Sequence, residues 1–100
     1  MTLEAYFAPT LVKIVRGGAD AGYHYGIGNA YGASQTGDII KMQGISFAEG
    51  LDMDRGVDVI LSAGWDEQFN TQTGQTEMGM LTIWSGSAEI DGTLIIVNGP

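Results

Sequence analysis

The chain is short of several residue types, and each shortage excludes a class of protein. It has no cysteine among its 100 residues, which excludes disulfides, thiolate zinc sites, iron–sulfur clusters and cysteine nucleophiles. Only four basic residues stand against twelve acidic ones, giving a net charge of −8. Because binding to phosphate backbones needs a basic face, nucleic acid is not an expected partner.

Long apolar runs are also lacking. No stretch approaches the ~18 apolar residues of a membrane span, so no membrane contact is expected. Near the start, an early Glu4 and the interruption of the apolar run by Lys13 do not fit a secretory signal. We therefore expect a soluble protein without a signal peptide, in a virion or in the cytoplasm, with the compartment left open.

Composition and length predict one ordered domain. Charged residues are only 16% of the chain while hydrophobic residues are 44%, which favours a folded core over disorder. The length suits a single domain over residues 1–100. Its acidity is concentrated in the second half: residues 51–100 carry eight acids and Arg55 as the only base, a balance of −7.

Short apolar segments separated by glycine are typical of strands. In one of them Val57, Val59 and Leu61 occupy alternate positions, the period-two pattern of a half-buried strand. The sequence predicts an all-β fold, a small sandwich or flattened barrel of about six short antiparallel strands with at most one or two short helical turns. The strands are expected near residues 10–16, 23–31, 38–47, 57–63, 78–84 and 88–97.

Turn signals complete this prediction. Asp91-Gly92 is a strong two-residue hairpin signal, because both positions of such a turn need positive φ. The polar run 71–76 is expected to be the exposed, mobile tip of a hairpin arm near 69–78. Short helical turns are expected at 2–7 and at 46–51, where Ser46 and Glu49 have capping-box spacing.

No set of catalytic residues stands out. His24 is the only histidine, and no serine lies in the turn motif that exposes a nucleophile. The adjacent carboxylates Asp66 and Glu67 would point to opposite faces of a strand, which does not suit paired acid–base chemistry. The glycines of segment 22–32 miss the spacing of a dinucleotide-binding loop. We expect neither enzymatic activity nor a cofactor.

Two groups of residues have binding chemistry of their own. Asp52, Asp54 and Asp58 alternate as the first ligands of a calcium loop do, but the positions of the later ligands hold Gly56 and Ala63. They are weak candidates, and no metal site is expected. In segment 22–32, tyrosines could stack on a sugar or dock a protein, or could line the wet rim of the core. These are Tyr23, Tyr25 and Tyr31.

The last apolar run predicts a contact surface. Residues 94–97 are all apolar, and alternate side chains of a strand point to opposite faces, so a one-sided core cannot bury them all. We therefore expect a protein partner or self-association, with a homo-oligomer favoured. The candidate interface residues are Leu94, Ile96, Tyr23, Tyr25, Tyr31 and Trp65.

Three hypotheses of function follow. The first is a non-enzymatic structural or assembly protein acting through protein–protein contacts, such as a small subunit that decorates a viral capsid or tail. The second is an acidic inhibitory protein that fills a basic groove on its target, as a nucleic-acid mimic does. The third is a carbohydrate-binding or calcium-dependent module that uses the tyrosines or the loop at Asp52.

Overall fold

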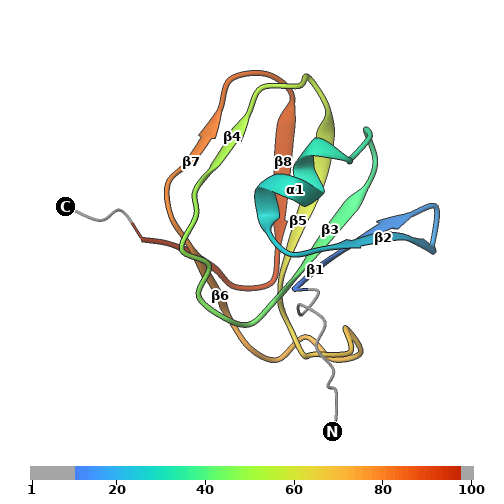
Figure 1. Ribbon diagram of the computed structural model, residues 1–100, viewed down its shortest axis with the longest axis vertical. Helices are drawn as coiled ribbons and strands as arrows, with labels where there is room; N and C mark the ends of the chain where they lie inside the picture. Colours follow the sequence, from blue (N-terminus) through green and yellow to red (C-terminus); the bar gives the residue numbers. More distant parts are fainter. Residues whose placement is uncertain (1–10, 98–100) are drawn as a thin grey trace, which may run out of the picture.

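The structure is a computed structural model that describes residues 11–97 (Figure 1). Within this range the chain forms nine strands and one short helix. In chain order they are β1 (Val12–Arg16), β2 (Ala19–His24), α1 (Ile27–Gly32), β3 (Ile39–Gln43), β4 (Leu51–Met53), β5 (Asp58–Trp65), β6 (Thr76–Met78), β7 (Leu81–Ile83), β8 (Ser87–Asp91) and β9 (Leu94–Ile96).

Most strand pairs are parallel. The largest sheet has the order β2-β1-β3-β5-β8, in which only β1 pairs antiparallel with its neighbours, while β3, β5 and β8 are parallel. Two further sheets consist of the parallel pairs β4–β7 and β6–β9. Ser46 adds an isolated parallel bridge to Glu77 beside the latter pair.

These pairings wind the chain into a short, three-sided parallel β-solenoid. The first face holds β3, β5 and β8, the second holds Ser46, β6 and β9, and the third holds β4 and β7. The chain visits the faces in this order, then returns to the first face one coil further on (Figure 1). Ile39 pairs with Ile60, so a coil without insertions takes 21 residues.

The prediction of a mostly β fold is confirmed, but the antiparallel sandwich or barrel is wrong. The expected strand 88–97 is two strands on different faces, β8 and β9, with a corner at Gly92 where φ is +85°. Positive φ at Gly92 is thus used to turn a corner of the solenoid instead of closing a hairpin. The expected strand 78–84 is likewise divided, because β6 ends at Met78 and β7 begins at Leu81.

The helix predictions also need correction. Segment 46–51 is not helical, and the short helix α1 occupies the second half of segment 23–31, which was expected to be a strand, and ends at Gly32. The spacing of Ser46 and Glu49 therefore does not mark the start of a helix at 46. Instead, the Glu49 carboxylate accepts hydrogen bonds from backbone amides of α1, which is distant in the sequence. The expected helical turn at 2–7 lies outside the described residues.

The polar segment after β5 is an insertion in the second coil and does not form the expected hairpin arm. Its Asp66 carboxylate accepts hydrogen bonds from the Asn70 amide at 2.8 Å and the Thr71 hydroxyl at 2.9 Å. These bonds, the Asn70 amide first, hold the pKa of Asp66 below its ordinary value. Phe69 is buried, with Lys13 5.6 Å from its ring centroid. The insertion therefore lies folded against the β1–β2 hairpin.

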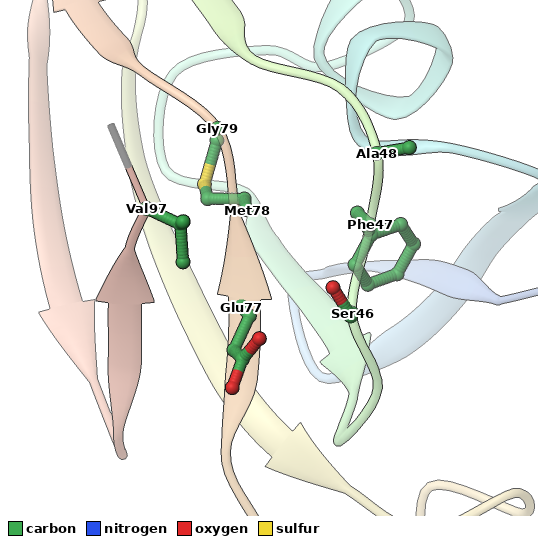
Figure 2. A pocket seen from close by; sticks show the side chains of 7 residues that line it. All are labelled: Ser46, Phe47, Ala48, Glu77, Met78, Gly79 and Val97. Carbon is green, nitrogen blue, oxygen red and sulfur yellow. The ribbon is translucent and has the colours of Figure 1, made fainter. Parts of the chain in front are cut away.

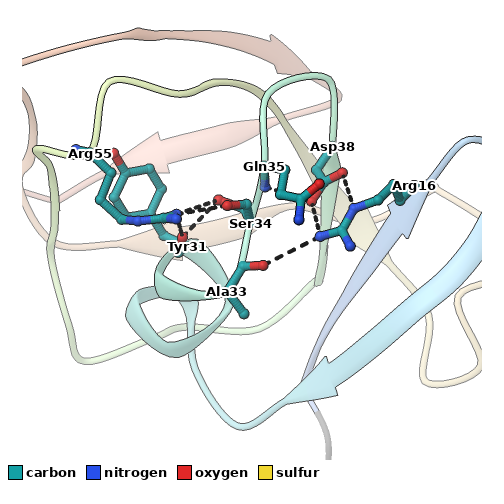
Figure 3. Close-up of polar contacts among 7 residues, drawn as sticks. All are labelled: Arg16, Tyr31, Ala33, Ser34, Gln35, Asp38 and Arg55. Carbon is teal, nitrogen blue, oxygen red and sulfur yellow. Dashed lines mark hydrogen bonds and ion pairs between the residues drawn. The ribbon is translucent and has the colours of Figure 1, made fainter.

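One end of the solenoid is covered by the β1–β2 hairpin and α1. The buried residues Ile27 and Ala30 of the helix pack in the same core as Ile14 and Ile40. Polar bonds fix this cap (Figure 3): Arg16 donates to buried Asp38, and Arg55 donates from its guanidinium to the Tyr31 carbonyl oxygen at 2.6 Å. The core is thus shielded from water at this end.

Glu49 supplies the cap that α1 lacks in its own sequence. The residue at the helix N-terminus is Gly26, which has no side chain, and the Glu49 carboxylate accepts from the Ile27 and Gly28 amides at 3.0 Å each. We expect Glu49→Ala to lower the free energy of unfolding by about 1 kcal/mol. Urea denaturation measures it, with exposed Glu67→Ala as the control; equal losses in both variants would contradict this role for Glu49.

Candidate functional site: the open end of the solenoid

Among residues 11–97, nothing covers the opposite end of the solenoid. On the first face, inward-pointing side chains form a column in which Ile40 pairs across to Leu61 and Leu61 to Ile90. The exposed fraction of these side chains is 0%, 0% and 45%. Ile90 occupies a core position, yet it is half-exposed because no further coil covers it among the described residues.

The other two faces end in the same way. On the second face Met78 is 1% exposed, whereas Ile96, which lies beside it in β9, is 37% exposed. On the third face Met53 is fully buried and its neighbour Ile83 in β7 is 45% exposed. The loss of burial in the last strand of every face defines a surface that we call the open end, consisting of β7, β8 and β9.

The open end also has unpaired strand edges. Strand β8 is the last strand of its sheet, and β7 and β9 each have one partner. Within residues 11–97, no strand pairs with their outer edges. A row of free N–H and C=O groups next to apolar side chains is a template for strand addition. The open end therefore combines hydrophobic contact area with directional hydrogen bonding.

A polar network holds β8 in place on β5. The Asp91 carboxylate accepts from the Ser62 hydroxyl at 2.8 Å and from the Gln72 amide nitrogen at 3.1 Å. These two bonds, with Ser62 the larger cause, lower the pKa of Asp91. The Trp65 ring nitrogen donates to the same Ser62 oxygen at 2.8 Å. These bonds tie the last strand of the first face to the preceding coil within the single chain.

The predicted interface residues do not lie together. Leu94 and Ile96 are on β9 at the open end, whereas Tyr23 belongs to β2 at the capped end, followed by exposed Tyr25. Tyr31 is buried in the core, and its hydroxyl accepts from the Arg55 amide at 2.8 Å, so the structure gives it a structural position. Trp65 is partly buried, with the Lys41 ammonium 3.9 Å from its ring centroid.

Three exposed residues of this region were missed or misplaced by the sequence. Ile83 and Ile90 are at the open end but were expected inside strands of an ordinary core. Trp84, the last residue of the expected strand 78–84, is 73% exposed beside β7. A coil assignment would have found Ile83 and Ile90, because each occupies an inward position of the last strand on its face.

The residues whose side chains could bind a metal ion or take part in catalysis are scattered. In residues 11–97, no three His, Asp or Glu side chains are grouped to hold a metal ion, and Asp52, Asp54 and Asp58 are exposed on separate positions. Asp58 accepts from the Ser87 hydroxyl at 3.0 Å, linking two coils. His24 ends β2, at the capped side of the sheet.

A shallow hollow lies beside the open end, between the second and third faces (Figure 2). It measures about 270 Å³ and is lined by Ser46, Phe47, Ala48, Glu77, Met78, Gly79 and Val97. Ligand pockets usually have ~300–1,000 Å³ and several converging polar groups. Among the described residues, Glu77 is the only ionisable group that lines the hollow, and they supply no pair of groups for acid–base catalysis there.

Comparison of the chain with protein-family models, curated proteins and solved structures finds no match to any of them. No helix in the described part of the chain is both long and apolar enough to cross a membrane. The open end therefore has to be interpreted from its own residues.

Proposed function

We propose that this chain is a non-enzymatic assembly module that acts through protein–protein contacts made by the open end. The observation that carries the proposal is the exposure of core positions in the last coil, clearest in the column of Ile40, Leu61 and Ile90. Apolar side chains that are in register with buried core residues, yet half-exposed in the single chain, form a surface suited to being covered by another chain.

The energetic argument supports contact at this end. Ile83, Ile90 and Ile96 are each roughly half-exposed, so complete burial of each would contribute about 1 kcal/mol. Hydrogen bonds to the free edges of β7, β8 and β9 would add direction more than affinity, since they replace bonds to water. Together these terms favour a partner that presents both apolar side chains and a strand edge.

A subunit that decorates a virion, which the sequence analysis put first, remains a prediction, and it would use a docking surface of this kind. The acidic inhibitor and the carbohydrate or calcium module have less support. The tyrosines of segment 22–32 are divided between surface and core, and the aspartates at 52–58 do not converge.

Substitutions at the open end test the proposal. Ile90→Asp and Ile96→Asp should leave the fold intact, because both side chains are already exposed, and should abolish whatever complex the wild type forms with itself or with a partner isolated with it from its source. Ile45→Asp is the matched control: Ile45 is 38% exposed but lies in the first coil. Circular dichroism checks the fold, and light scattering measures the mass.

Two outcomes would contradict the proposal. One is a complex that survives both open-end substitutions but is lost in Ile45→Asp, which would place the contact elsewhere. The other is a wild-type chain that stays alone both when pure and when isolated from its source.

A further inference from the structure

We propose that the open end is covered by the open end of a second copy of this chain, in a two-fold symmetric dimer whose solenoids meet end to end. This inference rests on the proposed function, to which it adds the identity of the partner. Its basis is that β7, β8 and β9 are complementary to the same strands of a second copy. The two copies are related by a two-fold axis that is perpendicular to the solenoid and runs beside the middle of β8, between it and the second copy's β8.

The covered end limits how copies can join. Head-to-tail stacking would require the open end of one copy to meet the opposite end of the next, where the β1–β2 hairpin and α1 lie over the core. Only the two open ends can therefore bring core against core. Such an arrangement is isologous and closes at two copies, whereas head-to-tail stacking would give a fibre.

Strand lengths and positions fit this symmetry. The axis places β8 antiparallel to the second copy's β8, and it exchanges the other two faces, so that β7 meets the second copy's β9. These last two strands both have three residues. Because the chain climbs along the solenoid axis in the order β7, β8, β9, β7 lies slightly lower than β8 on this axis and β9 slightly higher. When β7 of one copy meets β9 of the other, these two height differences cancel. All three strand pairs can then reach the usual spacing of about 4.8 Å together.

Inward side chains meet inward side chains in this arrangement. With β8 centred on its middle residue, Glu89, the small Ala88 faces the second copy's Ile90, which fills a core layer without crowding. In the other pairs Leu81 faces the second copy's Ile96, and Ile83 faces its Leu94. Antiparallel pairing about a residue keeps inward and outward positions separate, so no charged side chain enters the joined core.

The size of the contact sets the expected affinity. A coil of 21 residues at about 3.3 Å per residue encloses an end surface on the order of 400 Å² with its side chains. Two such surfaces bury on the order of 800 Å², which is below the ~1,200 Å² of stable specific interfaces and in the range of weak, transient contacts. We therefore expect a dimer with a Kd in the micromolar range or weaker, which forms and separates with protein concentration.

One outward pair opposes the dimer. Glu89 lies beside the axis and is exposed, so the two Glu89 carboxylates face each other directly across the strand pair. Like charges at directly opposite positions weaken antiparallel pairing. Removing this charge should strengthen self-association, an outcome that pairing with a different protein does not predict.

Sedimentation velocity from about 1 µM to 1 mM tests the dimer with the complete chain. We expect Glu89→Gln to bind itself about two- to fivefold more tightly than the wild type, as should raising the salt concentration for the wild type. Ile90→Asp should weaken the dimer at least tenfold, and Ile45→Asp should leave it unchanged. A wild type and a Glu89→Gln variant that are both monomeric at 1 mM would overturn the proposal.

Cross-linking tests the geometry, because the chain has no cysteine of its own. Directly opposite residues of an antiparallel pair have Cα atoms about 4.5–5.5 Å apart, within the range of a disulfide. Glu89→Cys should therefore form a covalent dimer when oxidised glutathione accepts the two electrons. Ser87→Cys should not, since Ser87 faces the second copy's Asp91. Equal yields from both variants would overturn the proposed pairing.

The two proposals can fail separately. A pure chain that stays monomeric and does not cross-link at position 89, but that loses another protein partner on Ile90→Asp substitution, would overturn the dimer and retain the assembly function. If Ile90→Asp weakens neither self-association nor binding to another protein, both proposals are overturned.

Discussion

Gly86→Ala should lower the free energy of unfolding by about 3 kcal/mol, whereas Gly18→Ala should lower it by only about 1 kcal/mol. Both glycines have φ of +82°, so a side chain meets the same backbone strain at both positions. They differ in their surroundings. At Gly86 a Cβ atom would collide with the backbone of Val57, one coil below, and at Gly18 it would meet nothing within 4 Å.

The difference between the two variants thus isolates the close approach of successive coils from the conformational cost of positive φ. Gly86 lies at the corner between β7 and β8, where the chain passes over the start of β5. Val57 can yield only by moving its backbone, since the colliding atoms are main-chain atoms. Urea denaturation of the two variants gives both values. Similar losses in both would show that the coils separate at this corner more easily than the structure indicates.

This corner also shows what the sequence could and could not predict. Local alternation identified the strand around Val59, and short apolar segments bounded by glycine indicated a mostly β fold. A glycine with positive φ, however, serves equally in a hairpin turn and in a solenoid corner. Asp91-Gly92 was interpreted as a hairpin because the distinction depends on which strand lies beside β8, and that strand, β5, is separated from it by more than twenty residues.

The candidate site was predictable only in part for the same reason. The apolar run 94–97 indicated a contact surface, and Leu94 and Ile96 do lie at the open end. Ile83 and Ile90 could not be recognised, because nothing local distinguishes an inward residue of a middle coil from one of the last coil. The long-range bond from Glu49 to α1 was missed similarly, since capping partners 21 and 22 residues apart leave no sequence pattern.

The second large effect concerns the charged group in the cap. Asp38 is buried just before β3, and it accepts from the Arg16 guanidinium at 2.8 and 2.7 Å and from the Gln35 amide at 2.8 Å. Asparagine at this position keeps the shape but cannot accept from all three donors. We expect Asp38→Asn to lower the free energy of unfolding by about 2 kcal/mol at pH 7, because charge-assisted bonds are lost in a buried place.

The pH dependence of that loss is the sharper test. The bonds from Arg16, and secondarily from Gln35, hold the pKa of Asp38 below its ordinary value, although burial opposes them. The unfolded carboxyl titrates near pH ~3.9, and its folded counterpart titrates lower. Between these values the unfolded state binds more protons. The stability that Asp38 contributes is therefore complete above the unfolded pKa and is lost as the pH falls through the folded one.

The difference between wild type and Asp38→Asn should accordingly be constant above about pH 5 and should shrink below about pH 4. Urea denaturation at a series of pH values measures this difference, in which the titration of all other carboxylates cancels. Exposed Asp54→Asn is the control and should have nearly the stability of the wild type at pH 7. A difference for Asp38→Asn that persists undiminished at pH 3 would mean that the Arg16–Asp38 pair does not fix the cap through charge.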